Sequence, residues 1–486
     1  MSSGAKIAKN AMWLMMATTG QKLIAFVSFT VVARLLGAEM TGVFFYSISI
    51  TSIFVTFADL GMTPVVIRAV AGNREDRHRL VGATLRSKAV LGPLAILGAL
   101  FYAISFGADA ITLTTVIIAC LVMSADTIHL VFYAALRGTQ NLRPEAIGML
   151  VGQLLTAIAS VTVAILGFGP VGLACALLIG SLWNVGWSGT QLQRAKFFSS
   201  KPARADYRVL AREAMPFGIA GIAVKVYSYV DSLFIQRFHG HAAVGVYAVA
   251  YKLTYAIQFL PITFTAALYP ALAASYARKN EKELTETFLG SLRLMGAIGF
   301  PFSAALSALA PKIIPFFYGN AFIDAVPAFA VMPWVLLPIF LDFPIGALLN
   351  ATHRAALKTT ALVITMIVNV LLNAALVPAY GPLGAAWAGV GSFWGLFFIG
   401  SWFVRHEAGG LWQIAKLTGR ALIGAAVIWY ALMRIAGPMP LIVSAVFGGS
   451  VAVLMAFMLR FITVDDVFLA WRKFRPSVKA PEAPHE

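Results

Sequence analysis

Two lysines interrupt apolar stretches that are long enough to cross a membrane. Lys22 opens the motif KLIAFVSFTVVARLLGAEMTGVF, and Lys225 opens the similar motif KVYSYVDSLFIQRFHGHAAVGVY. A charge at the centre of a membrane helix costs about 2.5–3.5 kcal/mol on insertion scales, so such residues usually face a bundle interior or a water-filled cavity. Two ammonium groups at one depth predict a positive site for an anionic substrate.

Other ionisable residues in apolar stretches extend this candidate site. Lys252 and Arg34 join the two lysines as candidate substrate-binding residues, although an arginine near a helix end can also snorkel to the membrane interface. Asp126 and His129 are three residues apart, so they share one helix face and could carry a proton. The candidate ion-coupling residues are Asp59, Asp126, His129 and Asp231.

Each of these residues also has a purely structural interpretation, which the sequence leaves open. The lysines could be neutralised by carboxylates of their own half of the chain, Lys22 by Asp59 and Lys252 by Asp231. In the same way, His129 could be an ordinary hydrogen-bonded histidine of the interior.

The composition identifies the elements that must position these residues. Of the 486 residues, 60% are hydrophobic and only 12% are charged, which is about half the charged fraction of a soluble protein. Apolar segments recur throughout the chain, and this predicts an all-α integral membrane protein. The two cysteines, Cys120 and Cys175, both fall in apolar segments and indicate neither a disulfide framework nor a zinc site.

About fourteen transmembrane helices are expected, each able to cross roughly 30 Å of hydrocarbon. The first is expected to be retained, because no small-residue cleavage site follows it. The expected spans are 11–35, 41–67, 86–106, 111–136, 144–167, 170–193, 213–236, 243–271, 287–310, 325–350, 357–378, 383–404, 413–433 and 439–461. An even number of crossings places both termini on the same side.

The basic residues indicate which side is cytoplasmic. Most of the 37 Lys and Arg residues lie on the side of the termini, among them the 68–88 loop that ends at Lys88, and only Arg237, Lys312 and Arg434 lie opposite. Positively charged loops stay in the cytoplasm, so both termini are expected there. The net charge of +17 then reflects topology and contact with anionic membrane lipids, and no nucleic-acid partner is expected.

The longest expected cytoplasmic loop divides the chain. It contains RAKFFSSKPARADYRVLAR and predicts an inter-lobe linker at 196–212, between a six-helix lobe at 1–195 and a second six-helix lobe at 213–405. Two additional helices at 406–462 and a basic cytoplasmic tail at 463–486 complete the expected organisation.

The two lobes carry matching motifs, which indicates a duplication. At one constant offset the matches are Lys22 with Lys225, Arg34 with Arg237, Gly37 with Gly240 and Gly42 with Gly245. Six helices per unit make the repeats parallel, and substrate sites of such transporters lie between the repeats near the membrane midplane. The glycines are expected to be structural, with Gly37 and Gly240 ending a helix through a positive φ angle.

Several motifs resemble those of a known family. ARLLGAEMTGVFFYSISI (33–50) and ADLGMTPVVIRAVAGNRED (58–76) resemble the opening of the Wzx-type polysaccharide flippases of the MOP exporter superfamily. ALRGTQNLRPEA (135–146) resembles the cytoplasmic turn after their fourth helix, and GPVGLA and GPLGAA resemble their periplasmic turns. The resemblance covers about residues 8–405.

This resemblance implies a V-shaped, two-lobe exporter that alternates between inward and outward openings. Its substrate would be an undecaprenyl-pyrophosphate-linked oligosaccharide, carried across the bacterial inner membrane for O-antigen, capsule or exopolysaccharide synthesis and coupled to H⁺ or Na⁺. A polysaccharide polymerase and a chain-length regulator are implied as partners. Lys22, Lys225 and Lys252 would contact the pyrophosphate or acidic sugars.

Three alternatives stay open. A lipid II flippase also has fourteen helices, whereas a MATE-type antiporter carries cations, which a cleft with lysines disfavours. A membrane-embedded glycan polymerase or ligase would belong to another class, but the expected outer loops are short and the halves are duplicated. The chain has no P-loop, HExxH, GxSxG or paired CxxC motif, so no enzymatic activity, cofactor or metal site is expected.

Overall fold

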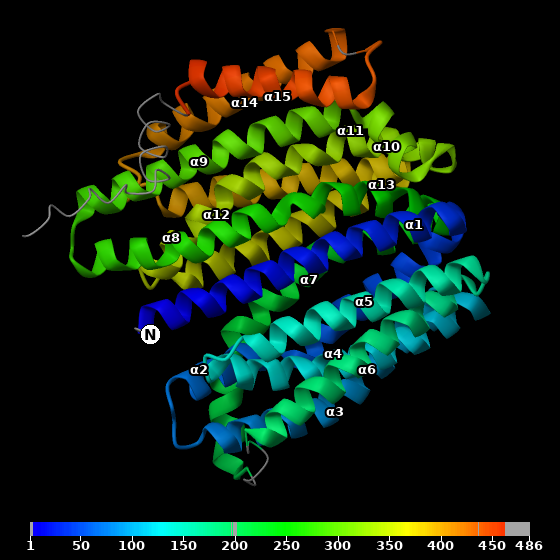
Figure 1. Cartoon of the computed structure of the whole chain (residues 1–486), viewed down its shortest axis with the longest axis vertical. Helices are drawn as coiled ribbons and strands as arrows, with labels where there is room; N and C mark the ends of the chain where they lie inside the picture. The colour runs from blue at the N-terminus through cyan, green and yellow to red at the C-terminus, as the bar shows by residue number, and fades with distance from the viewer. Residues whose placement is uncertain (1–2, 196, 198–201, 436, 462–486) are drawn as a thin grey trace, which may run out of the picture.

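The computed structural model describes residues 3–195, 197, 202–435 and 437–461, and in these ranges all regular structure is helical (Figure 1). The predicted basic tail at 463–486 lies outside the described residues. Residues 196 and 198–201 of the predicted linker lie outside them as well.

The helices follow one another with short connections. Their bounds are α1 (Ser3–Asp59), α2 (Met62–Ala71), α3 (Arg77–Ser105), α4 (Ala110–Gly138), α5 (Arg143–Ile165), α6 (Gly169–Arg194), α7 (Arg204–Tyr255), η1 (Ala256–Gln258), α8 (Phe259–Ala277), α9 (Glu281–Ala308), α10 (Ala310–Tyr318), η2 (Asn320–Ala325), α11 (Val326–Val331), η3 (Met332–Val335), α12 (Leu336–Ala351), α13 (Ala355–Phe403), α14 (Leu411–Ile435) and α15 (Leu441–Met458).

Among the described residues, eleven helical segments are long and apolar enough to cross a membrane. The protein is therefore a multi-pass membrane protein. Three of these segments are interrupted by a glycine with non-helical backbone angles, namely α1 at Gly37, α7 at Gly240 and α13 at Gly381. The segment expected as one span at 325–350 lies within one apolar helical segment, Asn320–Ala351, which is made of η2, α11, η3 and α12 in succession.

The two aligned glycines have nearly identical backbone angles. Gly37 has φ 75° and ψ −178°, and Gly240 has φ 77° and ψ −177°. Only glycine commonly occupies this region, because a Cβ atom would clash with the backbone there. The predicted positive φ at both positions is confirmed, and each glycine lets an apolar segment change direction without a loop.

The helices form two groups in space (Figure 1). Helices α2 to α6 make up one group, and α8, α9 and α11 to α13 make up the other. Helices α1 and α7 run between the groups, where α1 packs against α5 and α7, and α7 packs against α13. Helices α14 and α15 lie along the outer side of the second group, against α9.

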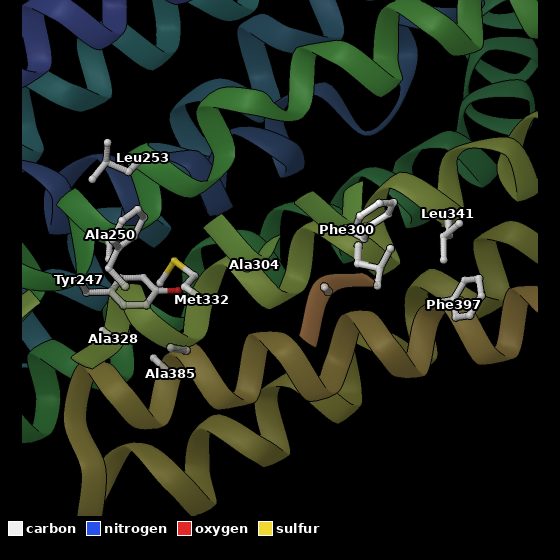
Figure 2. Packing of buried hydrophobic residues seen from close by; sticks show 14 of the residues in the cluster. Tyr247, Ala250, Leu253, Phe300, Ala304, Ala328, Met332, Leu341, Ala385 and Phe397 are labelled. Carbon is white, nitrogen blue, oxygen red and sulfur yellow. The ribbon is translucent and has the colours of Figure 1, made fainter. Parts of the chain in front are cut away.

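Small residues let the helices of the second group approach closely. Ala328 and Ala385 lie beside the larger side chains of Tyr247 and Met332 in the interior shown in Figure 2. In a membrane the apolar lipid offers no strong hydrophobic drive for association, so helices are held largely by such close packing. This packing fixes the positions from which α7 presents its polar side chains.

Helix α7 makes close backbone contacts at both ends of its interface, with α1 at one end and with the first group at the other. At one end, an ideal Cβ atom on Gly42 would lie 1.8 Å from the carbonyl oxygen of His241, and one on Gly245 would lie 1.9 Å from that of Ala38. These are equivalent pairs in the repeat, so the contact is nearly symmetric. We call this end the Gly42 end. Gly42 and Gly245 are structural, as the sequence predicts.

At the opposite end, which we call the Arg74 end, the start of α7 packs against α2 and α3. An ideal Cβ atom on Gly61 would lie 2.3 Å from the backbone nitrogen of Gly218. The Arg74 Nη1 atom donates to Glu213 Oε1 at 2.9 Å. Hydrogen bonds to Asp76 and to Glu213 raise the pKa of Arg74. The interface is therefore closed by contacts at both ends.

Candidate functional site

Three lysines gather around Tyr229 in the interior of the molecule. Lys225, Lys252 and Lys22 all lie close enough to Tyr229 to act electrostatically on its hydroxyl group. Lys22 comes from α1 and the other two from α7, one on either side of the break at Gly240. The fold thus brings together the three lysines that the sequence analysis selected.

Aromatic rings lie against two of the three ammonium groups. The Nζ atom of Lys225 lies 5.3 Å from the ring centre of Tyr229, and that of Lys252 lies 5.4 Å from Phe29 and 5.8 Å from Phe45. Cations over aromatic faces gain roughly 0.5–2 kcal/mol. The rings therefore hold Lys225 and Lys252 in position without cancelling their charge.

No carboxylate lies within 4.0 Å of these three ammonium groups in the part of the chain that the structure describes. The side chains of Lys22 and Lys252 are exposed and that of Lys225 is partly exposed. A cluster of uncompensated positive charges that remains accessible can bind an anion, because like charges near one another favour a counter-ion.

Arg34 does not belong to this cluster. It is exposed and lies near the break at Gly37, about 18 Å along the helix from Lys22 at a rise of 1.5 Å per residue. The structure separates Arg34 from the lysines.

Asp59 pairs with Lys88 instead of Lys22. The Nζ atom of Lys88 donates to Asp59 Oδ1 at 2.6 Å and to the carbonyl oxygen of Thr127 at 3.0 Å. The placement of Lys88 in a cytoplasmic loop is wrong, because α3 begins at Arg77 and the Lys88 side chain is only 3% exposed. A loop was expected from the run of basic residues in the sequence. Such a run does not show whether one of these residues has a buried partner on another helix.

Asp231 is buried and does not contact Lys252. Its Oδ2 atom accepts a hydrogen bond from the hydroxyl of Tyr247 at 2.5 Å, and its Oδ1 atom accepts one from Asn373 Nδ2 at 2.6 Å. The Oδ1 atom of Asn373 is buried and has no hydrogen-bond partner among the described residues. A carboxylate and a free amide oxygen together offer oxygen ligands of the kind that hard cations bind.

Asp126 and His129 lie together, as their spacing predicts. Asp126 Oδ1 accepts a hydrogen bond from Ser181 at 2.6 Å and lies 3.7 Å from His129 Nδ1. Lys225 also acts electrostatically on Asp126. The pair is therefore adjacent to one lysine of the cluster.

A cavity of ≈ 780 Å³ is enclosed by residues of α1, α4, α5, α6 and α7. Its wall includes Lys225 and three of the four predicted ion-coupling residues, Asp59, Asp126 and His129. Asp231 lies apart from it. Within the described ranges, no three His, Cys, Asp or Glu residues gather in the way that a metal site of such ligands requires.

Sequence reasoning missed the aromatic members of the site, Tyr229, Phe29 and Phe45. One signal was present for Tyr229, which follows Lys225 by four residues and therefore lies on the same helix face. No comparable signal existed for the phenylalanines, because they reach Lys252 from a different helix.

The membrane-spanning helical fold and the accessible charges in its interior define a membrane transporter. The model of the family described as "Polysaccharide biosynthesis protein" matches residues 7–276, which is more than half of the chain. The model described as MatE matches residues 216–375. The chain belongs to the polysaccharide biosynthesis protein family, the Wzx-type flippases of the MOP superfamily, which are transporters and not enzymes.

Curated relatives match over most of their length. The chain is 22% identical to the probable low-salt glycan biosynthesis flippase Agl15 of Haloferax volcanii, over 80% of this chain and 81% of that protein. It is 24% identical to the lipopolysaccharide biosynthesis protein WzxC of Escherichia coli K12, over 73% of this chain and 72% of that protein.

Solved structures share the fold. The lipid II flippase MurJ in an inward closed conformation superposes with a TM-score of 0.73 at 13% identity, over 92% of this chain and 98% of that one. At this identity the likeness concerns the fold alone.

Proposed function

We propose that this protein is a flippase for an undecaprenyl-pyrophosphate-linked oligosaccharide. It carries the repeat unit from the cytoplasmic to the periplasmic face of a bacterial inner membrane, for O-antigen, capsule or exopolysaccharide synthesis. The observation that carries the proposal is the cluster of Lys22, Lys225 and Lys252 around Tyr229. The names of the relatives, a glycan flippase and a lipopolysaccharide biosynthesis protein, support a lipid-linked glycan.

The lysine cluster suits a pyrophosphate. At about 4 Å and an effective dielectric constant near 20, one lysine–phosphate contact is attractive by roughly 4 kcal/mol before desolvation. Desolvation of the ammonium and phosphate groups opposes this attraction, so the head group is held without being trapped. A cationic substrate of the MATE type would be repelled by the same charges.

We propose that each glycine-interrupted helix crosses the membrane twice. The eleven apolar segments then give fourteen crossings, because α1, α7 and α13 each count as two. The chain divides into lobes at 1–195 and 213–405, joined by the linker at 196–212 and followed by two helices at 406–462 and the tail at 463–486. Both termini are cytoplasmic, so the Arg74 end faces the cytoplasm and the Gly42 end faces the periplasm.

Transport proceeds by alternating access between these ends. Separation of the lobes at the Arg74 end opens a V-shaped cleft to the cytoplasm, and separation at the Gly42 end opens one to the periplasm. A polysaccharide polymerase and a chain-length regulator would act on the delivered repeat unit. Anionic lipids would contact the basic cytoplasmic surface.

We further propose that transport is coupled to H⁺ or Na⁺ at two places. Asp231 is buried beside the unpartnered oxygen of Asn373, which makes it a candidate to take up a cation. Asp126 and His129 are candidates to exchange a proton beside Lys225. Asp59, grouped with them in the sequence analysis, already has Lys88 as a counter-charge in this conformation.

Replacement of the lysines tests the proposal. In a strain whose own copy of the gene is deleted, Lys225→Ala is expected to lower surface polysaccharide at least tenfold. Even a third of the gross lysine–phosphate attraction is about 1.4 kcal/mol, which corresponds to a tenfold loss of affinity. Lys225→Arg should retain most of the activity. Surface polysaccharide and the amount of protein in the membrane are both measured.

Lys416→Ala provides the matched control, because Lys416 is an exposed lysine of α14 far along the chain from the cluster. It should leave surface polysaccharide unchanged. Normal polysaccharide in the Lys22→Ala, Lys225→Ala double variant would refute a role for the cluster in substrate binding.

A lipid II flippase is the second candidate, favoured by the superposition over nearly the whole of that protein. Cells depleted of their own lipid II flippase distinguish the two functions. Rescue of their growth by this chain would favour the second candidate. Loss of surface polysaccharide on deletion, without rescue of lipid II transport, would favour the first.

A further inference from the structure

We propose that the ≈ 780 Å³ cavity is a binding site for the sugars of the substrate, separate from the lysine cluster that holds its pyrophosphate. This inference rests on the proposed function and specifies where the two parts of the head group lie. Lys225 belongs to both sites, since it lines the cavity and also lies over Tyr229. A sugar joined directly to the pyrophosphate would enter the cavity beside this lysine.

The cavity is elongated along α4. Its wall follows that helix from Ala119 to Arg137, which spans about 27 Å at 1.5 Å per residue. Its volume lies inside the range of roughly 300–1,000 Å³ that is usual for small-molecule sites. A long, narrow cavity of this size fits a chain of linked rings better than a compact ligand.

Two glutamines on the wall lack partners. Gln21 of α1 and Gln153 of α5 both line the cavity, and neither side-chain amide makes a hydrogen bond to another described residue. Both residues are partly exposed and line the cavity, so their amides are available to a ligand. A ligand that matches both amides needs donors as well as acceptors.

Sugar hydroxyl groups meet this requirement, because each one donates and accepts. A polyprenyl chain offers neither, and a metal cation would use only the oxygen of each amide. Asn184 of α6 adds a third amide to the wall, where its Oδ1 atom accepts from Tyr133 at 2.7 Å and its Nδ2 atom donates to the carbonyl oxygen of Gly180. This amide is fixed in orientation by its own bonds.

The charges on the wall favour a largely neutral ligand. Asp59 is paired with Lys88, and Glu145 forms an ion pair with Arg137. Of the Lys and Arg residues on the wall, only Lys225 has no ion-pair partner among the described residues. The wall also carries Asp126, on which Lys225 acts electrostatically, so these two opposite charges offset each other and the wall as a whole suits neutral sugars next to a phosphate.

Gly221 of α7 makes the cavity testable. It lines the wall, and an ideal Cβ atom built on it meets no atom within 4 Å, so a large side chain there would enter the cavity without straining the backbone. Gly186 of α6 is the matched control, since a Cβ atom on it is equally free but the residue does not line the cavity.

The experiment compares two forms of one lipid on the full chain in nanodiscs. One probe is lipid-linked oligosaccharide extracted from cells lacking this protein. The other is undecaprenyl pyrophosphate itself, which carries the same lipid and pyrophosphate without the sugars. Gly221→Trp is expected to weaken binding of the first probe at least tenfold and to change binding of the second less than twofold. Gly186→Trp should change neither.

Gln153→Leu is a second variant that removes hydrogen bonding without filling the cavity, and it should weaken only the sugar-bearing probe, by about fivefold. Equal loss of both probes, or loss of neither, in both cavity variants would overturn the sugar site and leave the proposed function standing. If the unmodified protein bound neither probe, the proposed function itself would fall, and the sugar site with it.

Discussion

The charged residues inside the membrane-spanning segments fall into two kinds. Asp59 with Lys88 and Asp342 with Lys358 are ion pairs, with closest N–O distances of 2.6 Å and 2.5 Å. Removing one partner of a buried ion pair typically lowers the free energy of unfolding by about 3–5 kcal/mol, so we assign these two pairs to the stability of the fold. Lys225 has no carboxylate partner in the described ranges and faces a cavity, which is the arrangement expected of a transport residue.

The proposed coupling role of Asp231 predicts a specific loss. In proteoliposomes, Asp231→Asn should abolish the stimulation of transport by an imposed Na⁺ or H⁺ gradient, because the neutral amide keeps the shape but loses the charge that attracts the cation. Asp126→Asn should abolish only the response to a pH gradient at constant Na⁺. Lipid-linked oligosaccharide reaching the inner leaflet or lumen is measured under each gradient.

Glu286→Gln is the control for this experiment, since Glu286 is an exposed acid at the start of α9. Its response to both gradients should equal that of the unmodified protein. Full stimulation in both aspartate variants would exclude both places from coupling.

At the scale of elements, the breaks at Gly37 and Gly240 determine how α1 and α7 meet. Each break turns an apolar helix so that the next turn, around Gly42 in α1 or Gly245 in α7, reaches the other of these two helices. The approach is close because neither residue has a Cβ atom. The matching glycine motifs of the two repeats thus each supply one side of this contact.

This contact predicts the effect of a single methyl group. Gly245→Ala places its Cβ atom about 1.9 Å from the Ala38 carbonyl oxygen, so the closed contact cannot persist. Overpacking of this kind costs roughly 1–3 kcal/mol, which corresponds to a 5–150-fold shift toward the form separated at the Gly42 end. Spin labels at Phe106 and Tyr380, both exposed, would report a longer distance.

Gly186→Ala is the matched control, because its surroundings are open. It should leave the distance distribution unchanged. An unaltered distribution in Gly245→Ala would mean that the contact does not govern opening at this end.

At the scale of the whole molecule, the asymmetry of basic residues predicts orientation. The Arg74 end carries the ion pair between Arg74 and Glu213 and lies on the side expected to be cytoplasmic. Both side chains of this pair are about one-third exposed, so it contributes only about 0.2–1 kcal/mol to closure and can break during transport.

Reporter fusions test this orientation. Green fluorescent protein fused after Arg208 should fluoresce, because that point is expected in the cytoplasm and basic loops resist translocation. Alkaline phosphatase fused after Gly107 should be active, because that point is expected in the periplasm. Alkaline phosphatase and green fluorescent protein fusions give complementary signals. Alkaline phosphatase activity after Arg208 would invert the proposed topology and exchange the roles of the two ends.

Much of the fold follows from local sequence. Runs of apolar residues form helices in a membrane because no water is present to satisfy the backbone, and this holds whatever the neighbouring helices are. The breaks at Gly37 and Gly240 were predictable for a similar reason, since the backbone preference of glycine is a local property. The family membership rested on motifs read directly from the chain, and the comparisons confirm it.

The composition of the site was only partly predictable. The improbable position of Lys22 and Lys225 in apolar segments identifies them as candidates without any structure. Which acid each lysine meets depends on how separate helices are rotated against each other, and no local pattern encodes that rotation. The tertiary structure alone therefore decided that Asp59 pairs with Lys88, that Asp231 meets Asn373, and that unpartnered amides line a cavity beside Lys225.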